Sequence, residues 1–158
     1  MWWQIWNVRS KGKMKAKKKF KARTGASFPK KDAQKIGEEL ELIKSKGVLN
    51  PRNVVKEAKN KKSILHNYFD WDDSVASEKW RLQQARSIVN HVLEIIVIKG
   101  EQVEERAFFN VIAKNNEKVY VSLTEVITTP RYKKQLLKEM EITLQNLLKL
   151  IRLFSSMG

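Results

Sequence analysis

The residues best suited to acid–base or metal chemistry lie in one short segment of the chain. His66 is followed by Asp70, Asp72 and Asp73, and imidazole and carboxylate groups at this spacing could coordinate a divalent cation. The carboxylates have a simpler explanation, because Asp residues just before a helix accept hydrogen bonds from its free N–H groups and offset its dipole. His66 lies among aromatic residues, which favours a hydrogen-bonded structural histidine. We therefore predict neither a metal site nor a catalytic base in this segment.

Other catalytic patterns are missing from the sequence. The chain has two histidines and no cysteine, which excludes disulfides and thiolate metal sites. His91 falls near the end of an expected helix, where a histidine usually interacts with the helix C-terminus. The sequence contains no phosphate-binding glycine loop, nucleophile elbow or paired zinc-ligand spacing. We predict a protein that is not an enzyme and needs no cofactor.

Positive charge is concentrated in the first 31 residues. They contain eleven Lys and Arg and no Asp or Glu, so they carry +11 of the net +15, and the remaining residues hold 32 − 11 = 21 basic and 17 acidic residues. Such a segment repels itself and attracts polyanions. We expect residues 1–31 to be a disordered arm that contacts phosphates. Its cations are Arg9, Lys11, Lys13, Lys15, Lys17, Lys18, Lys19, Lys21, Arg23, Lys30 and Lys31.

Three tryptophans precede these cations. Trp2, Trp3 and Trp6 could lie at a membrane interface, stack on bases or a partner, or have no role of their own. The apolar start is followed by basic residues, whereas a signal peptide has the reverse order and a longer apolar run. No apolar run approaches the roughly 18 residues that span a bilayer. We expect an intracellular protein for which a membrane is not the main partner.

The remaining residues, 32–158, are long enough for one domain with its own core. Apolar residues recur at helical spacing from Ala33 to Ile43, and Gly47 is a typical helix end. Asn50 and Pro51 are typical of a helix start, because Asn is a good cap and proline suits the first helical position. The expected helical region is residues 32–92: a helix ending at Gly47, a short helix from Pro51, a helical turn within 63–73, and a long helix over 74–92 that Asp72 and Asp73 cap.

The second half of the domain has the composition of strands. Segments 94–99, 106–112 and 118–123 are rich in β-branched and aromatic residues, and the short links between them predict a three-stranded antiparallel sheet within residues 93–127. Pro130 separates this sheet from a last helix over residues 131–154. The sequence therefore predicts an α+β fold with a helical first half, a small antiparallel sheet and a long amphipathic C-terminal helix.

The last helix has the clearest periodicity in the chain. Leu137, Leu144 and Ile151 are seven residues apart, and Met140, Leu147 and Phe154 follow them at three-residue spacing. This is the a/d pattern of a coiled coil over about two and a half heptads. The helix either packs on the chain's own sheet or pairs with the helix of a second copy in a homodimer. The candidate oligomerisation residues are Leu137, Met140, Leu144, Leu147 and Ile151.

Binding is the class of function that this composition favours. The helices between residues 32 and 69 could form a helix-turn-helix, with the following strands as a wing. DNA would face either the basic residues around the short helix or the outer face of the long helix, because Arg, Gln and Asn pair with base edges. The first set is Arg52, Lys56, Lys59, Lys61 and Lys62, and the second is Lys79, Gln83, Gln84 and Arg86.

Three motifs carry a resemblance to a known group of proteins. Leu49-Asn-Pro-x-x-Val-Val55 is followed by Leu65-His-x-Tyr-Phe-x-Trp-Asp-Asp73 and by Gln84-Ala-Arg86. Together they resemble a widespread group of small proteins from tailed bacteriophages and prophages. The resemblance covers most of the chain, and it implies action in the cytoplasm of a bacterial host or in a virion. It implies no activity and no active site.

We therefore predict binding of nucleic acid, with double-stranded DNA favoured over RNA. Phosphate attraction does not distinguish the two polymers, so RNA remains open. The alternative is a virion structural protein, or a recombination or assembly accessory protein, whose main partner is another phage protein.

Overall fold

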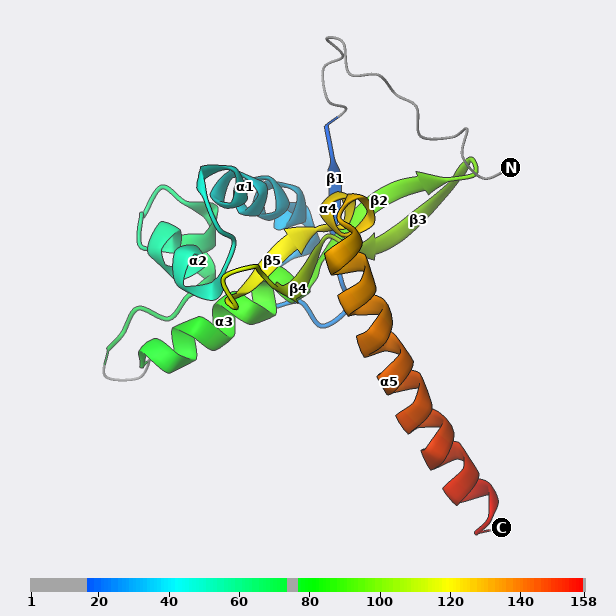
Figure 1. Cartoon of the computed structure of the whole chain (residues 1–158). Coiled ribbons are helices and arrows are strands. Elements are labelled where there is room, and N and C mark those ends of the chain that lie inside the picture. The colour runs from blue at the N-terminus through cyan, green and yellow to red at the C-terminus, as the bar shows by residue number, and fades with distance from the viewer. Residues whose placement is uncertain (1–16, 74–76, 158) are drawn as a thin grey trace.

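The chain adopts an α+β fold in the computed structural model, which describes residues 17–73 and 77–157 (Figure 1). The first half is mainly helical and the last helix is long, so the predicted fold class is confirmed. The helices are η1 (Lys30–Asp32), α1 (Ala33–Lys46), α2 (Pro51–Ala58), η2 (Ile64–Tyr68), α3 (Glu78–Asn90), α4 (Leu123–Thr128) and α5 (Pro130–Ser155). The strands are β1 (Lys19–Ala22), β2 (Val92–Ile98), β3 (Glu101–Arg106), β4 (Phe108–Ile112) and β5 (Lys118–Ser122).

Local signals fix the ends of the first helices. Gly47 follows the last residue of α1, as predicted. The Asn50 side chain accepts a 2.8 Å hydrogen bond from the backbone N–H of Asn53, and Pro51 occupies the first position of α2. The predicted helical turn in segment 63–73 is η2. Because the required groups are close in sequence, these predictions are confirmed almost residue for residue.

The predicted start and end of α3 are wrong. Ser77 caps the helix, with its side chain accepting from the Trp80 N–H, so Asp72 and Asp73 are not the caps. The helix ends at Asn90, and Val92 already pairs in β2. Residues 74–76 lie outside the described part of the chain. Serine and aspartate are both strong N-caps. The residue types alone therefore do not distinguish Ser77 from Asp72 or Asp73 as the cap of α3.

The strands form two sheets rather than one meander. A three-stranded antiparallel sheet is present, as predicted, but it consists of β1, β2 and β3 in that order. Of the three predicted strands only segment 94–99 belongs to it, and the other two pair with each other as β4 and β5. The expected strand over 106–112 is divided at Ala107. This fully buried residue donates to the Val92 carbonyl at 3.1 Å and accepts from the Leu123 N–H at 3.2 Å. The backbone of Ala107 therefore links β2 to the start of α4.

The prediction of a disordered arm through residue 31 is wrong, because Lys19–Ala22 form strand β1. It pairs with β2 along its whole length, and it places Phe20 in the main core, where the ring stacks on Phe108 with centroids 6.5 Å apart. Phe28 is also buried in this core. The Gln34 side chain accepts from the Phe20 N–H at 2.8 Å and donates to the Lys18 carbonyl at 2.9 Å. The rest of the expected arm, residues 1–16, lies outside the described residues.

Gly37 leaves the space that Phe20 occupies. A Cβ atom at Gly37 would lie 2.8 Å from the Cβ of Phe20 and closer still to its ring. We expect Gly37→Ala to lower the free energy of unfolding by up to about 2 kcal/mol, because overpacking costs about 1–3 kcal/mol against a gain of about 1 kcal/mol in helix propensity. Urea unfolding measures this change.

A second glycine provides the matched control. A Cβ at Gly47 would meet no atom within 4 Å, so Gly47→Ala adds the same methyl group without a clash. We expect its unfolding midpoint to stay close to that of the wild type. If Gly37→Ala were as stable as the wild type, Phe20 would not be seated against α1.

The core has two parts. The larger cluster joins α1, α2, η2 and α3 to residues of β1, β2, β4 and β5, with Ile36, Leu65 and Phe108 fully buried. The smaller one lies between the pair β4-β5 and the helices α4 and α5, where Tyr132 and Leu136 pack against Val126 and its neighbours. Beyond Leu136, α5 projects away from the body (Figure 1). The alternative in which its a/d residues pack on the chain's own sheet is therefore wrong.

Candidate nucleic-acid interface

The segment from His66 to Asp73, whose residue types could perform acid–base or metal chemistry, has a structural role. The His66 Nδ1 lies 2.8 Å from the Ala58 carbonyl oxygen, and its ring stacks on Trp71 with centroids 5.0 Å apart. Asp73 forms an ion pair with Arg81, and Asp70 accepts from the backbone N–H of Asp72 at 3.2 Å. Within residues 17–73 and 77–157, no three His, Asp or Glu side chains are grouped as a metal site would require.

His91 has the position that the sequence predicts. It follows the last residue of α3, and its backbone N–H donates to the carbonyls of Ser87 and Ile88. Its ring Nδ1 lies 2.7 Å from the Ser87 carbonyl oxygen. This histidine therefore completes the C-terminus of α3.

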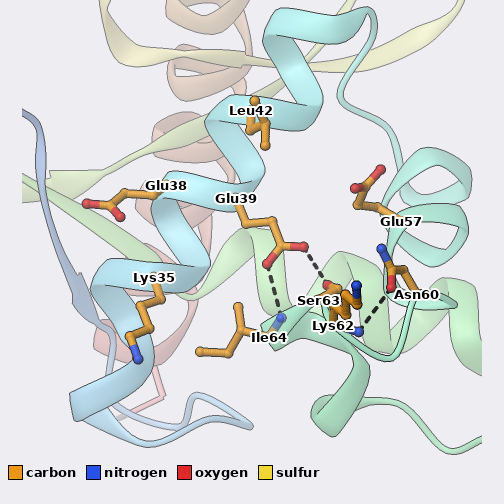
Figure 2. A pocket seen from close by; sticks show the side chains of 9 residues that line it. All are labelled: Lys35, Glu38, Glu39, Leu42, Glu57, Asn60, Lys62, Ser63 and Ile64. Atoms are coloured by element: carbon orange, nitrogen blue, oxygen red, sulfur yellow. Dashed lines mark hydrogen bonds between the residues drawn. The ribbon is translucent and has the colours of Figure 1, made fainter.

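A pocket of about 440 Å³ between α1 and η2 is also explained by folding (Figure 2). The Glu39 carboxylate accepts from the Ser63 hydroxyl and, at 3.2 Å, from the Ile64 N–H, so it satisfies the start of η2. Asn60 accepts from the Lys62 N–H at 3.0 Å and closes the turn after α2. Lys62, a predicted DNA contact, lines this mixed-charge pocket together with three glutamates. The polar groups of this pocket hold α1 and η2 together.

Several cations of the expected arm are paired with carboxylates of the body. Lys17 lies 2.9 Å from Glu38, and Lys21 pairs with Glu104. The Lys18 ammonium lies 2.9 Å from Glu41 and 3.4 Å from Glu94. Burial alone would lower the pKa of Lys18, but the two carboxylates more than offset it and raise that pKa. These three lysines attach β1 to α1 and to its own sheet rather than reaching outward.

The other predicted arm residues divide into two groups. Lys19, Arg23, Lys30 and Lys31 are exposed, and none of them forms an ion pair with another residue that the structure describes. Arg9, Lys11, Lys13 and Lys15 lie outside the described residues. The structure thus leaves the phosphate-binding role of these eight cations as a prediction.

A cationic hollow lies between α2 and α3. Arg52, Lys56 and Lys59 are spaced by four and three residues, so they lie on one face of α2 and of Lys59, the helical residue that directly follows it. All three are exposed. They line a hollow of about 230 Å³ together with Glu78 and Arg81 of α3. Arg81 is already engaged, because its Nε donates to the Asp70 carbonyl at 3.0 Å and its guanidinium lies 5.6 Å from the Trp71 ring centre. The cations of this hollow that have no internal partner among the described residues are therefore Arg52, Lys56 and Lys59.

A second hollow of about 500 Å³ shares Arg52 with the first. It is formed by the start of α2, by Arg86 of α3 and by the pair β4-β5, which contributes Asn110, Lys118 and Tyr120. The Tyr120 N–H donates to the Leu49 carbonyl at 2.7 Å, which fixes β5 beside the start of α2. Burial raises the pKa of Tyr120 although nearby Arg106 and Arg86 act to lower it. A neutral tyrosine therefore forms part of its wall.

We call the two hollows together the cationic groove and define its free cations as Arg52, Lys56, Lys59, Arg86 and Lys118. All five are exposed, and none of them has an ion-pair partner among residues 17–73 and 77–157. Glu78 and Glu117 are the acidic residues that line the groove. The groove can therefore bind a polyanion without first breaking an internal ion pair.

The structure brings together some of the residues that the sequence predicted as nucleic-acid contacts. Arg52, Lys56 and Arg86, from two separate sequence sets, lie around one groove. Lys118 was not predicted, because its proximity to α2 depends on the bridge between Leu49 and Tyr120 and has no local signal. Lys61 is exposed in the turn after α2 and, like Lys62, does not line the groove. Gln84 is used internally, accepting from the Asp70 N–H at 3.3 Å.

Comparisons with known proteins assign no function to this surface. No protein family, curated protein or solved structure matches the chain. In the part of the chain that the structure describes, no helix is long and apolar enough to cross a membrane. The charge and shape of the cationic groove are therefore the features that bear on the function of this chain.

Proposed function

We propose that this protein is a non-enzymatic nucleic-acid-binding protein whose main ligand is double-stranded DNA. The observation that carries this proposal is the cationic groove, where five exposed Lys and Arg side chains from α2, α3 and β5 converge without ion-pair partners among the described residues. Phosphate oxygens are the ligands that such side chains bind most readily. The residues 1–16, with four further cations, would add contacts of the same kind.

The shape of the groove favours a duplex over a small phosphorylated ligand. Its cations extend along α2 and across to β5 instead of surrounding one point. An α-helix with its side chains is roughly 10–12 Å across, so a helix such as α2 fits the roughly 12 Å width of the major groove of B-DNA. Arg52 and Arg86 line the same hollow as the amide side chain of Asn110. Arg and Asn are side chains that can read base edges once phosphate contacts have positioned the protein.

A helix-turn-helix role with a wing is consistent with this arrangement. In that role α2 and α3 would contact the duplex, and the pair β4-β5, next to the start of α2, would act as the wing. The resemblance to phage and prophage proteins would place this activity in a bacterial host or a virion. A protein partner with an acidic surface is the second candidate, because phosphates and carboxylates are attracted by the same charges.

Removing three groove cations tests the proposal. We expect Arg52→Ala/Lys56→Ala/Lys59→Ala to weaken binding of a 20-base-pair duplex by roughly 100-fold at moderate salt and to make the slope of log K against log[salt] shallower by about 3, since each phosphate contact contributes about 0.9. Fluorescence anisotropy at several salt concentrations measures both quantities.

The matched control removes the same charge elsewhere. Lys35, Lys138 and Lys149 are exposed and do not line the groove, so Lys35→Ala/Lys138→Ala/Lys149→Ala should change affinity by less than about threefold. If both triple variants weakened binding equally, net charge rather than the groove would control it. Binding of an acidic protein but of no duplex or RNA would favour the second candidate.

A further inference from the structure

We propose that α5 is an assembly helix that packs antiparallel against α5 of a second copy of this chain. Every residue from Leu137 to Met157 is exposed. Eleven of these are large apolar side chains with 36–74% of their surface exposed: Leu137, Met140, Ile142, Leu144, Leu147, Leu148, Leu150, Ile151, Leu153, Phe154 and Met157. Monomeric proteins rarely expose an apolar patch larger than a few hundred Å².

The apolar stripe of α5 begins inside the body and continues outside it. Tyr132 and Leu136 pack against the cluster around Val126, and the a/d residues extend the same side of the helix beyond this contact. The residues of α5 from Leu137 to Ser155 span roughly 28 Å at 1.5 Å per residue. The body therefore covers the first turns only, and a helix of equal length fits the rest.

The charges of α5 select an antiparallel pair. Arg131, Lys133, Lys134 and Lys138 are concentrated at the end near the body. Lys133 also lies seven residues before Met140, so it falls in the d series of the heptad. A parallel pair would place Lys133 against the partner's Lys133 and bring two basic ends together, which costs free energy. An antiparallel pair separates these ends by most of the helix length.

The heptad also gives the register of an antiparallel pair. Each a residue then faces a d residue of the partner: Leu137 with the partner's Phe154, Met140 with the partner's Ile151, and Leu144 with the partner's Leu147. Glu141 lies on the same side as the partner's Arg152 and near its level along the axis, so opposite charges meet. Leu136 lies near the partner's Met157, which would join this core to the cluster in the body.

The absence of cysteine from the chain makes the register directly testable by disulfide mapping. In the antiparallel pair, two Leu137→Cys sites would be roughly 25 Å apart, whereas a disulfide needs Cα atoms within about 7 Å. We expect neither Leu137→Cys nor Phe154→Cys to cross-link alone under mild oxidation, and a mixture of the two to give the covalent heterodimer. Cross-linking of each variant alone would overturn the antiparallel register.

Sedimentation of the cysteine-free chain tests the pairing itself. We expect the wild type to be a dimer at tens of micromolar and Leu144→Lys/Leu147→Lys to be a folded monomer, with circular dichroism confirming the fold of the body. Gln145→Lys/Asn146→Lys adds the same charge outside the a/d positions and should remain dimeric. A wild type that sediments as a monomer at tens of micromolar would overturn the proposal, and none of these measurements depends on nucleic-acid binding.

Discussion

A chain that lacks residues 1–31 will not fold, whereas a chain that lacks residues 1–16 will keep the stability of the full-length protein. The longer deletion removes β1 together with Phe20 and Phe28, which belong to the main core. Loss of one buried phenylalanine side chain costs about 3–5 kcal/mol, and natural domains are stable by only about 5–15 kcal/mol. The shorter deletion removes none of the described contacts.

Urea unfolding followed by far-ultraviolet circular dichroism measures this difference. We expect a cooperative transition for residues 17–158 and none for residues 32–158. The single substitution Phe20→Leu serves as a milder control, because it keeps an apolar side chain in the slot beside Gly37 and β1 in place. A cooperative transition for residues 32–158 with the full-length midpoint would show that β1 contributes nothing to the core.

The difference between these two deletions could not be predicted from the sequence. Residues 17–21 contain four lysines, a composition typical of disorder when each residue is considered with its neighbours alone. The strand forms because distant groups compensate these charges: Glu41 and Glu94 hold Lys18, and Gly37 admits Phe20. Each of these partners is at least 16 residues away, so no local pattern predicts them.

The elements that sequence did predict have their signals within a few residues. Asn50 and Pro51 define the start of α2, and Pro130 defines the start of α5. The division at Ala107 has no comparable signal, because β3 before it contains three glutamates and does not have the composition of a strand. Which sheet a strand joins depends on the partners that the whole fold supplies.

The sequence likewise predicts only part of the cationic groove. The basic character of α2 and α3 was visible in the sequence, and Arg52, Lys56 and Arg86 lie where two helices and a strand pair meet. Sequence did not separate them from Lys17, Lys18 and Lys21, which the body neutralises. A count of lysines predicts affinity for polyanions, but only the fold determines which lysines have no carboxylate beside them.

Pairing through α5 would increase the affinity of the cationic groove for a long duplex. An antiparallel α5 pair would carry one cationic groove near each end, and two grooves on one particle raise avidity for a long polyanion without a new contact. The Leu144→Lys/Leu147→Lys monomer would then bind a short duplex as well as the wild type does but a long duplex more weakly. Binding of the short duplex would thus report the groove separately from assembly.

The central claim is tested most directly by the salt dependence of duplex DNA binding by the full-length chain. If the five groove cations and the four cations of residues 1–16 contact phosphates, log K should fall with log[salt] with a slope of about −8 per chain, and affinity should fall roughly 10⁴- to 10⁵-fold between 50 and 200 mM salt. Removal of residues 1–16 should make the slope shallower by about 3.6. No binding of duplex DNA at 50 mM salt, or binding whose slope is near zero, would contradict the account.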